Sequence, residues 1–382
     1  MARKRNNPFV TIGDIPSEYF CDRVKETESI IRTLTNESNL VLMSPRRMGK
    51  SKLIQHCFKQ PQISEQYYTF YIDLLQTSSL RELTYAFGKA VFDQLKTRGE
   101  KATLSLVHAL RSLAGTFGFD SLSGMPTFTL EMGRIAQPEF TLQEIFGWLE
   151  QAEKPCIVCF DEFQKVNRYT DNRDGRVEAL LRSHIQHLSG VNFIFSGSER
   201  HLLAEMFYSQ AKPFYNSASQ LNLKALDLDV YQEFASHWFE AYDKRINKDA
   251  IIPFYEKLEG TTYYLQKLMH EAFADTLPGE TCDSEKLQNA FDNMIEEARE
   301  TYQKQLGSLS ERTKEVLYAI AREGHAQKIM SIAFIKRYAL ASPSVVQTAV
   351  KNLIDAEIVT LQEGVYTVSD VLFALYLRKM LQ

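Results

Sequence analysis

The sequence predicts an α/β protein in which a mostly parallel β-sheet is flanked by helices and is followed by two smaller parts. Over residues 1–227, short apolar segments alternate with longer segments of helical periodicity. Such alternation is typical of strands that are joined in parallel by helical crossovers and buried on both faces. After about residue 227 the strand signals stop, and helical patterns alone continue as far as the tail.

The expected strands are short, apolar and followed by polar turns. They are residues 39–43, 67–72, 156–160, 191–195 and, with a weaker pattern, 220–223. The expected helices of this core have apolar residues at helical spacing, and they are residues 50–59, 79–97, 101–114, 141–152, 174–189 and 199–206. Residues 165–173 are polar and are interpreted as a loop. Residues 115–139 are interpreted as an insertion with a β-hairpin near Thr127–Leu130.

The C-terminal part predicts two further domains. Four helical segments form an expected lid, and they are residues 228–242, 248–258, 262–275 and 283–305. The tail has helical patterns at 311–322, 331–338 and 343–355 and then a two-strand pattern around Gly364, which is the element order of a winged helix-turn-helix. The predicted division is therefore a core at 1–227, a helical lid at 228–306 and a winged helix at 307–382.

The composition is that of an ordinary globular protein. The chain has 382 residues, of which 44% are hydrophobic and 24% charged, and its net charge is −4. This charge argues against a protein coated in positive charge for nucleic acid, although it permits a local basic patch. No stretch approaches the roughly 18 apolar residues of a membrane span, so no membrane partner is expected. The five scattered cysteines predict reduced thiols and a cytoplasmic location.

A phosphate-binding loop follows the first expected strand. The segment fits the Walker A pattern G-x-x-x-x-G-K-[ST] at every fixed position but the first, and with the next lysine it comprises Ser44, Pro45, Arg46, Arg47, Met48, Gly49, Lys50, Ser51 and Lys52. Backbone N–H groups and the N-terminus of the following helix would surround the phosphates. Lys50 would reach the β- and γ-phosphates, and the Ser51 hydroxyl would be a ligand for Mg²⁺. ATP and Mg²⁺ are therefore the expected ligands.

The first residue of this loop departs from the pattern, and its two arginines can be interpreted in two ways. Ser44 stands where glycine is usual, and serine adopts a positive φ less readily, so the start of the loop is expected to differ there, with Pro45 stiffening it. Arg46 and Arg47 are interpreted either as contacts for phosphates or a partner subunit, or as solvated loop residues.

Two adjacent carboxylates end the strand at 156–160. Ligands bind at the carboxyl ends of strands in such sheets, which is where Asp161 and Glu162 stand, in the position of a Walker B motif. Asp161 is expected to hold Mg²⁺ through water, and Glu162 is expected to take a proton from the attacking water. Glu162 is thus the residue that turns a nucleotide binder into a predicted ATP hydrolase, with Lys50 as the second catalytic group.

The strand at 191–195 ends in Phe195-Ser196-Gly197-Ser198. If this strand lies between the other two, Ser196 or Ser198 would face the γ-phosphate as a sensor. The alternative is a Ser-Gly turn in which Ser198 caps the helix at 199–206.

These segments together resemble the archaeal-type ATPases of the AAA+/STAND-like branch of P-loop proteins, which include many bacterial members. The segments that carry the resemblance are Tyr19–Glu26, the Ser44–Ser51 loop, F-D-E-F-Q at 160–164, F-S-G-S at 195–198, Lys212–Tyr215 and the winged-helix tail. The resemblance implies a P-loop NTPase core of the ASCE class, a helical lid and a winged helix. It also implies that Phe20 and Arg23 neighbour the base or ribose, with core burial as the alternative for Phe20.

The chain departs from that family at two places. Asn216-Ser217 stand where the family often has Gly-Arg, so an arginine role there is absent. The lid has Glu259-Gly260-Thr261-Thr262-Tyr263 where the family often has G-G-x-P, which puts contact between lid and nucleotide in doubt.

The function predicted from these residues is a Mg²⁺-dependent ATPase that binds ATP and ADP and acts as a nucleotide-driven switch. The hypothesis includes a homo-oligomer as one option for its assembly. One alternative is a scaffold that binds ATP without hydrolysis; another is a DNA-binding regulator. The expected third helix of the winged helix, 344–355, has one lysine and one aspartate, which predicts weak DNA binding and favours an unidentified protein partner.

Overall fold

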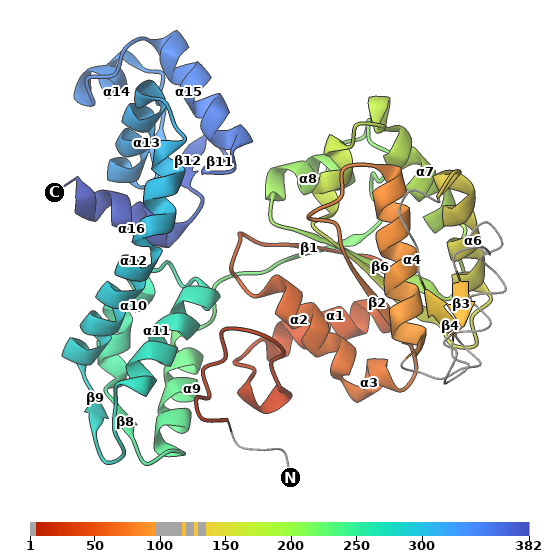
Figure 1. Cartoon of the computed structure of the whole chain (residues 1–382), viewed down its shortest axis with the longest axis horizontal. Helices are drawn as coiled ribbons and strands as arrows, with labels where there is room; N and C mark the ends of the chain where they lie inside the picture. The colour runs from red at the N-terminus through yellow and green to blue at the C-terminus, as the bar shows by residue number, and fades with distance from the viewer. Residues whose placement is uncertain (1–4, 97–116, 120–125, 129–134, 382) are drawn as a thin grey trace. The chain divides into compact units, whose positions relative to one another are not determined.

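The computed structural model describes residues 5–96, 117–119, 126–128 and 135–381. The chain forms two compact units (Figure 1). The sheet unit comprises residues 23–45 and 50–223, and the helical unit comprises residues 1–22, 46–49 and 224–382. The change of unit after Leu223 lies close to the expected boundary at 227, whereas the division between lid and winged helix at 306 stays a prediction.

The sheet unit is built on a five-stranded sheet with the order β2-β5-β6-β1-β7, and every pair in it is parallel. Its strands are β1 (Leu40–Met43), β2 (Tyr68–Asp73), β5 (Cys156–Asp161), β6 (Val191–Gly197) and β7 (Ser219–Asn222). The predicted fold class is confirmed. The condition set for the sensor residues is also met, because β6 lies between β1 and β5.

Helices cover this sheet on both faces (Figure 1). They are α1 (Val24–Thr35), α2 (Lys50–Lys59), α3 (Pro61–Ser64), α4 (Leu80–Lys96), α6 (Pro138–Glu150), α7 (Arg176–Ile185) and α8 (Arg200–Tyr208). One face has a continuous core of aromatic and aliphatic side chains from β2, β5 and β6 together with α4, α6, α7 and α8. Alternate strand residues point to the other face, where α1 packs against β1 and α2.

The insertion and the segment that follows β5 both contain short elements of secondary structure. The insertion contains an antiparallel pair, β3 (Phe117–Phe119) with β4 (Pro126–Phe128), while the expected helix at 101–114 lies outside the described residues. The expected loop at 165–173 instead contains two 3₁₀ turns, η4 (Phe163–Arg168) and η5 (Arg173–Gly175). Gly175, with a φ of 74°, ends the second turn and delays the start of α7.

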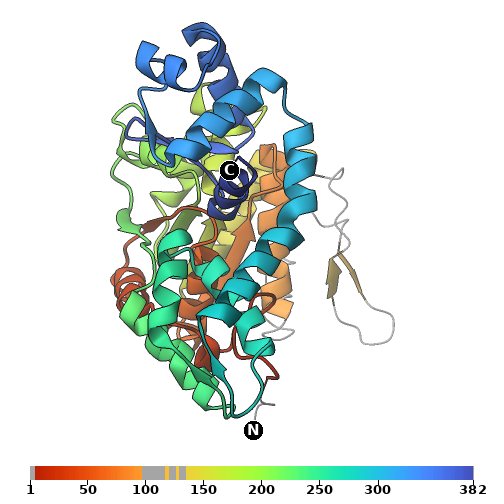
Figure 2. The same cartoon turned by 90° about the vertical axis from the view of Figure 1, so that its left-hand side faces the viewer.

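The helical unit consists mainly of helices around one hydrophobic core (Figure 2). They are η1 (Ser17–Tyr19), α9 (Leu228–Glu240), η6 (Lys248–Ile251), α10 (Ile252–Lys257), α11 (Thr262–Ala274), α12 (Ser284–Gly307), α13 (Glu311–Glu323), α14 (Ile332–Arg337), α15 (Pro343–Asp355) and α16 (Val371–Met380). The long helix α12 packs against α11 at one end and against α16 of the tail. Within the described residues, no helix combines the length and apolar character that crossing a membrane would require.

The tail has the winged-helix order, with α13, α14 and α15 followed by the hairpin β11 (Val359–Gln362) and β12 (Val365–Val368); β10 (Ala326–Gln327) extends this hairpin into a three-stranded sheet. The expectation that residues 228–305 contain helices only was wrong. Two short strands, β8 (Arg245–Ile246) and β9 (Thr281–Cys282), pair in parallel. Two residues are too few to produce the alternation by which a strand is recognised in a sequence.

The N-terminal segment is part of the core of the helical unit. Phe9 is fully buried, and its ring centroid lies 5.8 Å from that of Phe234 and 5.7 Å from those of Phe239 and Phe273. The backbone beside it is also held, since the carbonyl oxygen of Phe9 lies 2.8 Å from Nδ1 of His270. The segment before η1 is therefore integral to the lid helices.

We expect Phe9→Ala to lower the free energy of unfolding of the helical unit by about 3 to 5 kcal/mol, because a large buried ring is removed and its cavity remains. Urea unfolding followed by the fluorescence of Trp238, in a Trp148→Phe background, measures this. Ile12→Ala is the matched control, since Ile12 is 84% exposed, and it should change stability by no more than about 0.5 kcal/mol. Equal urea midpoints for the two variants would contradict the anchoring role of Phe9.

Candidate functional site

The carboxyl ends of β1, β5 and β6 bring the predicted catalytic side chains together in the sheet unit. The Lys50 ammonium, at the start of α2, donates to Asp161 Oδ1 and lies 3.3 Å from Glu162 Oε1. The Ser51 hydroxyl donates to Asp161 Oδ2 at 2.7 Å. Lys50 and Asp161 are almost fully buried, with side chains 7% and 5% exposed. One ammonium thus faces two carboxylates where little water reaches them.

Burial and charge act in opposite directions on these groups. Burial alone would lower the pKa of Lys50, but Asp161 and Glu162 outweigh it and the pKa is raised. For Asp161, burial acts to raise the pKa, and the Lys50 ammonium, with hydrogen bonds from Lys50, Ser196 and Ser51, lowers it to about 2. Lys50 and a hydrogen bond from Gln164 likewise outweigh burial and lower the pKa of Glu162. All three groups are therefore charged at neutral pH.

Glu162 is held in an unusual backbone conformation. Its φ of 56° and ψ of 41° are left-handed, which is uncommon for a residue with a side chain and is often found at functional sites. Its Oε2 atom accepts hydrogen bonds from the Gln164 amide at 2.5 Å, the Ser198 hydroxyl at 2.8 Å and the Ser198 N–H at 3.2 Å. The turn after β5 thus directs Glu162 toward the end of β6.

The two predicted sensor serines have different partners. The Ser196 hydroxyl donates to Asp161 Oδ1 at 2.6 Å, whereas that of Ser198 donates to Glu162. Glu199, not Ser198, is the N-cap residue of α8, so the capping interpretation of Ser198 is wrong. Gly197 between them packs closely on its neighbours, because an added Cβ would overlap the Gln164 side chain and lie 2.7 Å from Leu203.

Sequence reasoning missed two members of this site. The Tyr71 hydroxyl on β2 donates to Asp161 Oδ2, and Gln164 on η4 donates to Glu162. Tyr71 stands in an apolar segment whose pattern indicates a strand and nothing more. Gln164 lay in the segment F-D-E-F-Q, which indicated a family but not a role. The role of each residue follows from its contact with a carboxylate, and that contact depends on how the ends of the strands lie next to one another.

The chain at the tip of the loop belongs to the helical unit. Positive φ angles fall at Arg47 (68°) and Gly49 (86°), and not at Ser44, so the start of the loop does not use the backbone conformation that serine adopts less readily. The expected difference from loops that have glycine at this position stays a prediction. Ser44 is instead buried, and its N–H donates to the Gly197 carbonyl at 3.4 Å. The Met48 carbonyl accepts a hydrogen bond from the Thr262 hydroxyl at 3.2 Å.

The two loop arginines have acidic partners within the helical unit. Arg46 pairs with Glu357, and the Arg47 guanidinium lies 3.2 Å from Asp370 and over the ring of Tyr264. They are therefore not solely solvated loop residues, although their contact with phosphates stays a prediction.

The remaining predicted nucleotide neighbours divide between the helical unit, which contains Phe20, and the sheet unit, which contains Arg23, Pro45 and Lys52. The Lys52 ammonium lies 3.3 Å from Gln55 Oε1 on its own helix. The Arg23 guanidinium is buried and pairs with Glu26 at 2.9 Å. Phe20 is half-buried directly after η1. Pro45 joins β1 to the loop tip. Their contact with base, ribose or phosphate stays a prediction.

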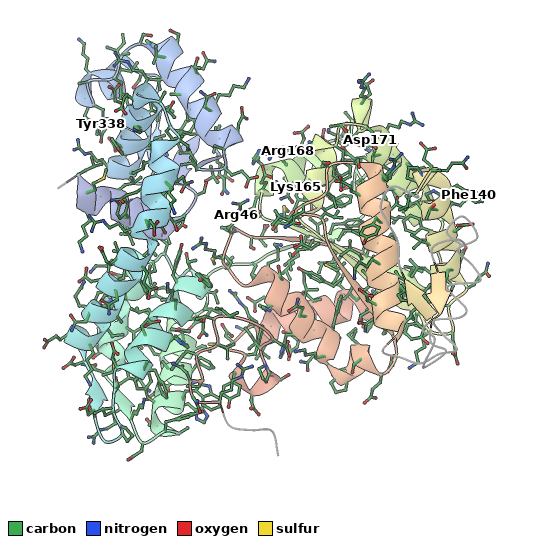
Figure 3. The ribbon with its side chains drawn as sticks, in the orientation of Figure 1. Arg46, Phe140, Lys165, Arg168, Asp171 and Tyr338 are labelled. Carbon is green, nitrogen blue, oxygen red and sulfur yellow. The ribbon has the colours of Figure 1, made fainter. Side chains whose placement is uncertain are left out.

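The turn that follows Glu162 exposes charged residues at the surface. Lys165 and Arg168 both project from η4 in Figure 3, and Arg168 pairs with Glu199 at 2.5 Å. This ion pair joins η4 to the start of α8. It thereby ties together the two segments that supply Gln164 and Ser198.

The oxygen atoms at the site fit a magnesium ion. Within the ranges that the structure describes, no group of three or more His, Cys, Asp or Glu side chains is placed to hold a metal. Mg²⁺ is usually bound by one or two carboxylates together with phosphates and waters. The Ser51 hydroxyl and the Asp161 carboxylate, 2.7 Å apart, would supply the protein part of that set.

This fold and this site define the class of P-loop nucleotide-binding proteins. The model of a family described as an ATPase domain predominantly from Archaea matches residues 20–268, and the chain belongs to this family. A model described as a probable winged helix domain matches residues 300–379. A search of curated proteins found no significant match.

Solved structures show the same fold at low identity. The Walker-type ATPase PABY2304 of Pyrococcus abyssi has a TM-score of 0.68 and 20% identity, over 97% of this chain and 99% of that chain. The ORC2 protein of Aeropyrum pernix, in ADPNP–ADP complexes, has a TM-score of 0.60 and 13% identity, over 99% of each chain. The ORC1 protein of Aeropyrum pernix, in complex with DNA, has a TM-score of 0.51 and 12% identity, over 98% of this chain and 96% of that chain.

We expect Lys50→Met to destabilise the nucleotide-free protein by about 3 kcal/mol at pH 8, because two buried carboxylates then lack their counter-charge. Without Lys50 their pKa values rise above those of the unfolded chain, so the loss should shrink as the pH falls toward 5.5 and they take up protons. Urea unfolding at the two pH values measures this.

Adding Asp161→Asn to Lys50→Met should restore most of the stability, since it removes one of the uncompensated charges. Lys59→Met, at an exposed position of the same helix, is the matched control. A Lys50→Met variant as stable as this control at pH 8 would contradict the electrostatic account.

Proposed function

We propose that the protein binds ATP with Mg²⁺ at Lys50, Ser51 and Asp161 and hydrolyses it to ADP and phosphate. The observation that carries this proposal is the convergence of Lys50, Asp161 and Glu162 at the end of β5. Membership of an ATPase-domain family supports it.

Each side chain has a proposed task. The Lys50 ammonium exchanges its carboxylate partners for β- and γ-phosphate oxygens, with the N–H groups of the loop around them. The Ser51 hydroxyl and Asp161 hold the magnesium ion, which would neutralise charge on the phosphates.

Glu162 is the proposed base. Its lowered pKa keeps it ionised at neutral pH, so it can accept a proton from water. In the nucleotide-free structure its Oε1 atom faces Lys50 and its Oε2 atom accepts bonds from Gln164 and Ser198. When Lys50 turns to phosphate, Oε1 becomes available to the attacking water while Oε2 stays held. Ser198 and Gln164 thus orient the base.

We expect Glu162→Gln to retain ATP binding and to lower turnover by about 100-fold or more, because the amide cannot accept the proton. Phosphate release measures turnover, and a fluorescent ATP analogue measures binding. Glu150→Gln, an exposed position on α6, is the control and should leave both unchanged.

Lys50→Ala supplies the background for the same assay. Wild-type turnover no faster than this background, with ATP still raising the melting temperature, would favour the scaffold that binds ATP without hydrolysis. Unchanged turnover in Glu162→Gln would exclude Glu162 as the base.

The hydrolysis is proposed to operate a switch. The phosphate loop contributes to both units, since Arg46–Gly49 belongs to the helical unit while Lys50 and Ser51 belong to the sheet unit. Anions that gather at the loop would compete with Glu357 and Asp370 for its arginines. Binding and hydrolysis of the nucleotide would in this way change the ion pairs that the winged helix makes with the loop arginines. The oligomeric state of Glu162→Gln with ATP, by size-exclusion chromatography, tests for a homo-oligomeric form of the switch.

A protein partner is proposed for the winged helix, and DNA is the second candidate. The ORC1 relative in complex with DNA favours the second. However, the exposed positions of α15 include one lysine, Lys351, and one aspartate, Asp355. Affinity for DNA depends largely on neutralising phosphates, and this helix adds no net positive charge.

We expect Lys351→Ala to leave duplex DNA binding as weak as in the wild type, with the same salt dependence, because α15 is not proposed to contact DNA. Fluorescence anisotropy between about 50 and 200 mM salt measures this. Lys304→Ala, exposed on α12, is the control. A salt slope lowered by about one in Lys351→Ala alone would instead indicate that α15 binds the DNA backbone.

A further inference from the structure

The Asp161 carboxylate accepts hydrogen bonds from predicted site residues and also from Tyr71, which the sequence did not predict as a site residue. Its Oδ1 atom accepts from the Lys50 ammonium, from the Ser196 hydroxyl at 2.6 Å and from the Glu162 N–H at 3.0 Å. Its Oδ2 atom accepts from the Ser51 hydroxyl at 2.7 Å and from the Tyr71 hydroxyl. Among these partners, Tyr71 is the one on β2, whereas the others belong to the loop, to β6 or to the residue directly after β5.

The position of Tyr71 follows from the register of the sheet. On the neighbouring strands, Tyr71 pairs with Cys159 and Asp73 pairs with Asp161. Residues two apart on a strand share a face, so Tyr71 and Asp161 are diagonal neighbours on one face of the sheet, within reach of a long aromatic side chain. Phe70 and Ile72, on either side, point into the core of the other face. Because Phe70 and Ile72 are buried in that core, the backbone of β2 is held so that Tyr71 points to the face on which Asp161 lies.

The phenol and the Ser51 hydroxyl meet on the same carboxylate oxygen. Ser51 and Asp161 are the residues that would hold the magnesium ion, Asp161 through water, and Tyr71 contacts the carboxylate oxygen of Asp161 that also binds Ser51. Partners of metal ligands fix the orientation of those ligands, and their loss typically weakens metal affinity by 10- to 100-fold. A phenol can also accept a hydrogen bond from water while it donates one.

We propose that Tyr71 is a positioning residue that orients the Asp161 carboxylate toward Ser51 and the magnesium ion that accompanies the nucleotide. This inference rests on the proposed function. Tyr71 touches neither phosphate nor attacking water in this account and acts through Asp161. Its loss should therefore weaken the binding of Mg²⁺ and leave the binding of nucleotide without metal intact.

Tyr71→Phe tests this, because it removes the hydroxyl and keeps the ring that packs on the sheet. The affinity for a fluorescent ATP analogue is measured in EDTA and then across a titration of Mg²⁺. We expect the half-saturating Mg²⁺ concentration to rise about tenfold, while the affinity in EDTA changes by less than twofold. A repeat of the titration with Mn²⁺ should show the same direction of change.

Tyr169→Phe is the matched control. Tyr169 is also a buried tyrosine of the sheet unit, and its hydroxyl lies 2.5 Å from that of Thr77 and not at Asp161. It should leave the Mg²⁺ titration unchanged, and the melting temperatures of both variants confirm that they fold. If Tyr71→Phe needs no more Mg²⁺ than the wild type, or needs less, the positioning role is wrong. If the wild type itself shows no response to Mg²⁺, the proposed function fails together with this inference.

Discussion

The buried ammonium of Lys50 is the interaction on which the nucleotide-free site depends. It faces two carboxylates in a setting with little water, where unpaired charges would be costly. The arrangement is stable because the ammonium and the carboxylates neutralise each other's charge. The same arrangement is suited to exchange, because phosphate oxygens carry the charge that a lysine at this position requires. A site of this kind is held together by groups that must later separate.

The sheet provides the geometry for that pairing. Parallel strands end at one edge, and the order β5-β6-β1 places Asp161, Ser196 and the start of the phosphate loop on consecutive strands. The backbone then makes local exceptions to regular structure: a left-handed Glu162 after β5 and a glycine at 197 that allows η4 to pack against β6. These exceptions lie at the end of the sheet where chemistry is proposed, whereas no residue within the largely buried strands β1, β2, β5 and β6 has a positive φ.

The fold class and most of the candidate site residues could be predicted from the sequence, because the signal for them is local. A strand, a turn and a helix impose the spacing of the short segments that contain Lys50, Ser51, Asp161 and Glu162. Tyr71 could not be found in this way, because its role comes from a pairing register across β2 and β5 that no local pattern specifies. The short strands β8 and β9 were missed for the same reason, since each is defined by its partner.

The burial of Phe9 also bears on the order in which the protein can form. The chain changes unit after residues 22, 45, 49 and 223, so neither unit is one continuous stretch of sequence. During synthesis Phe9 leaves the ribosome long before α9 and α11, which supply its aromatic neighbours, have been made. Until then an apolar N-terminal segment is exposed beside a sheet unit that already has most of its strands. The helical unit therefore closes last, around a segment that was made before the sheet unit, and such late long-range closure is the step at which folding is slow and association with other chains competes.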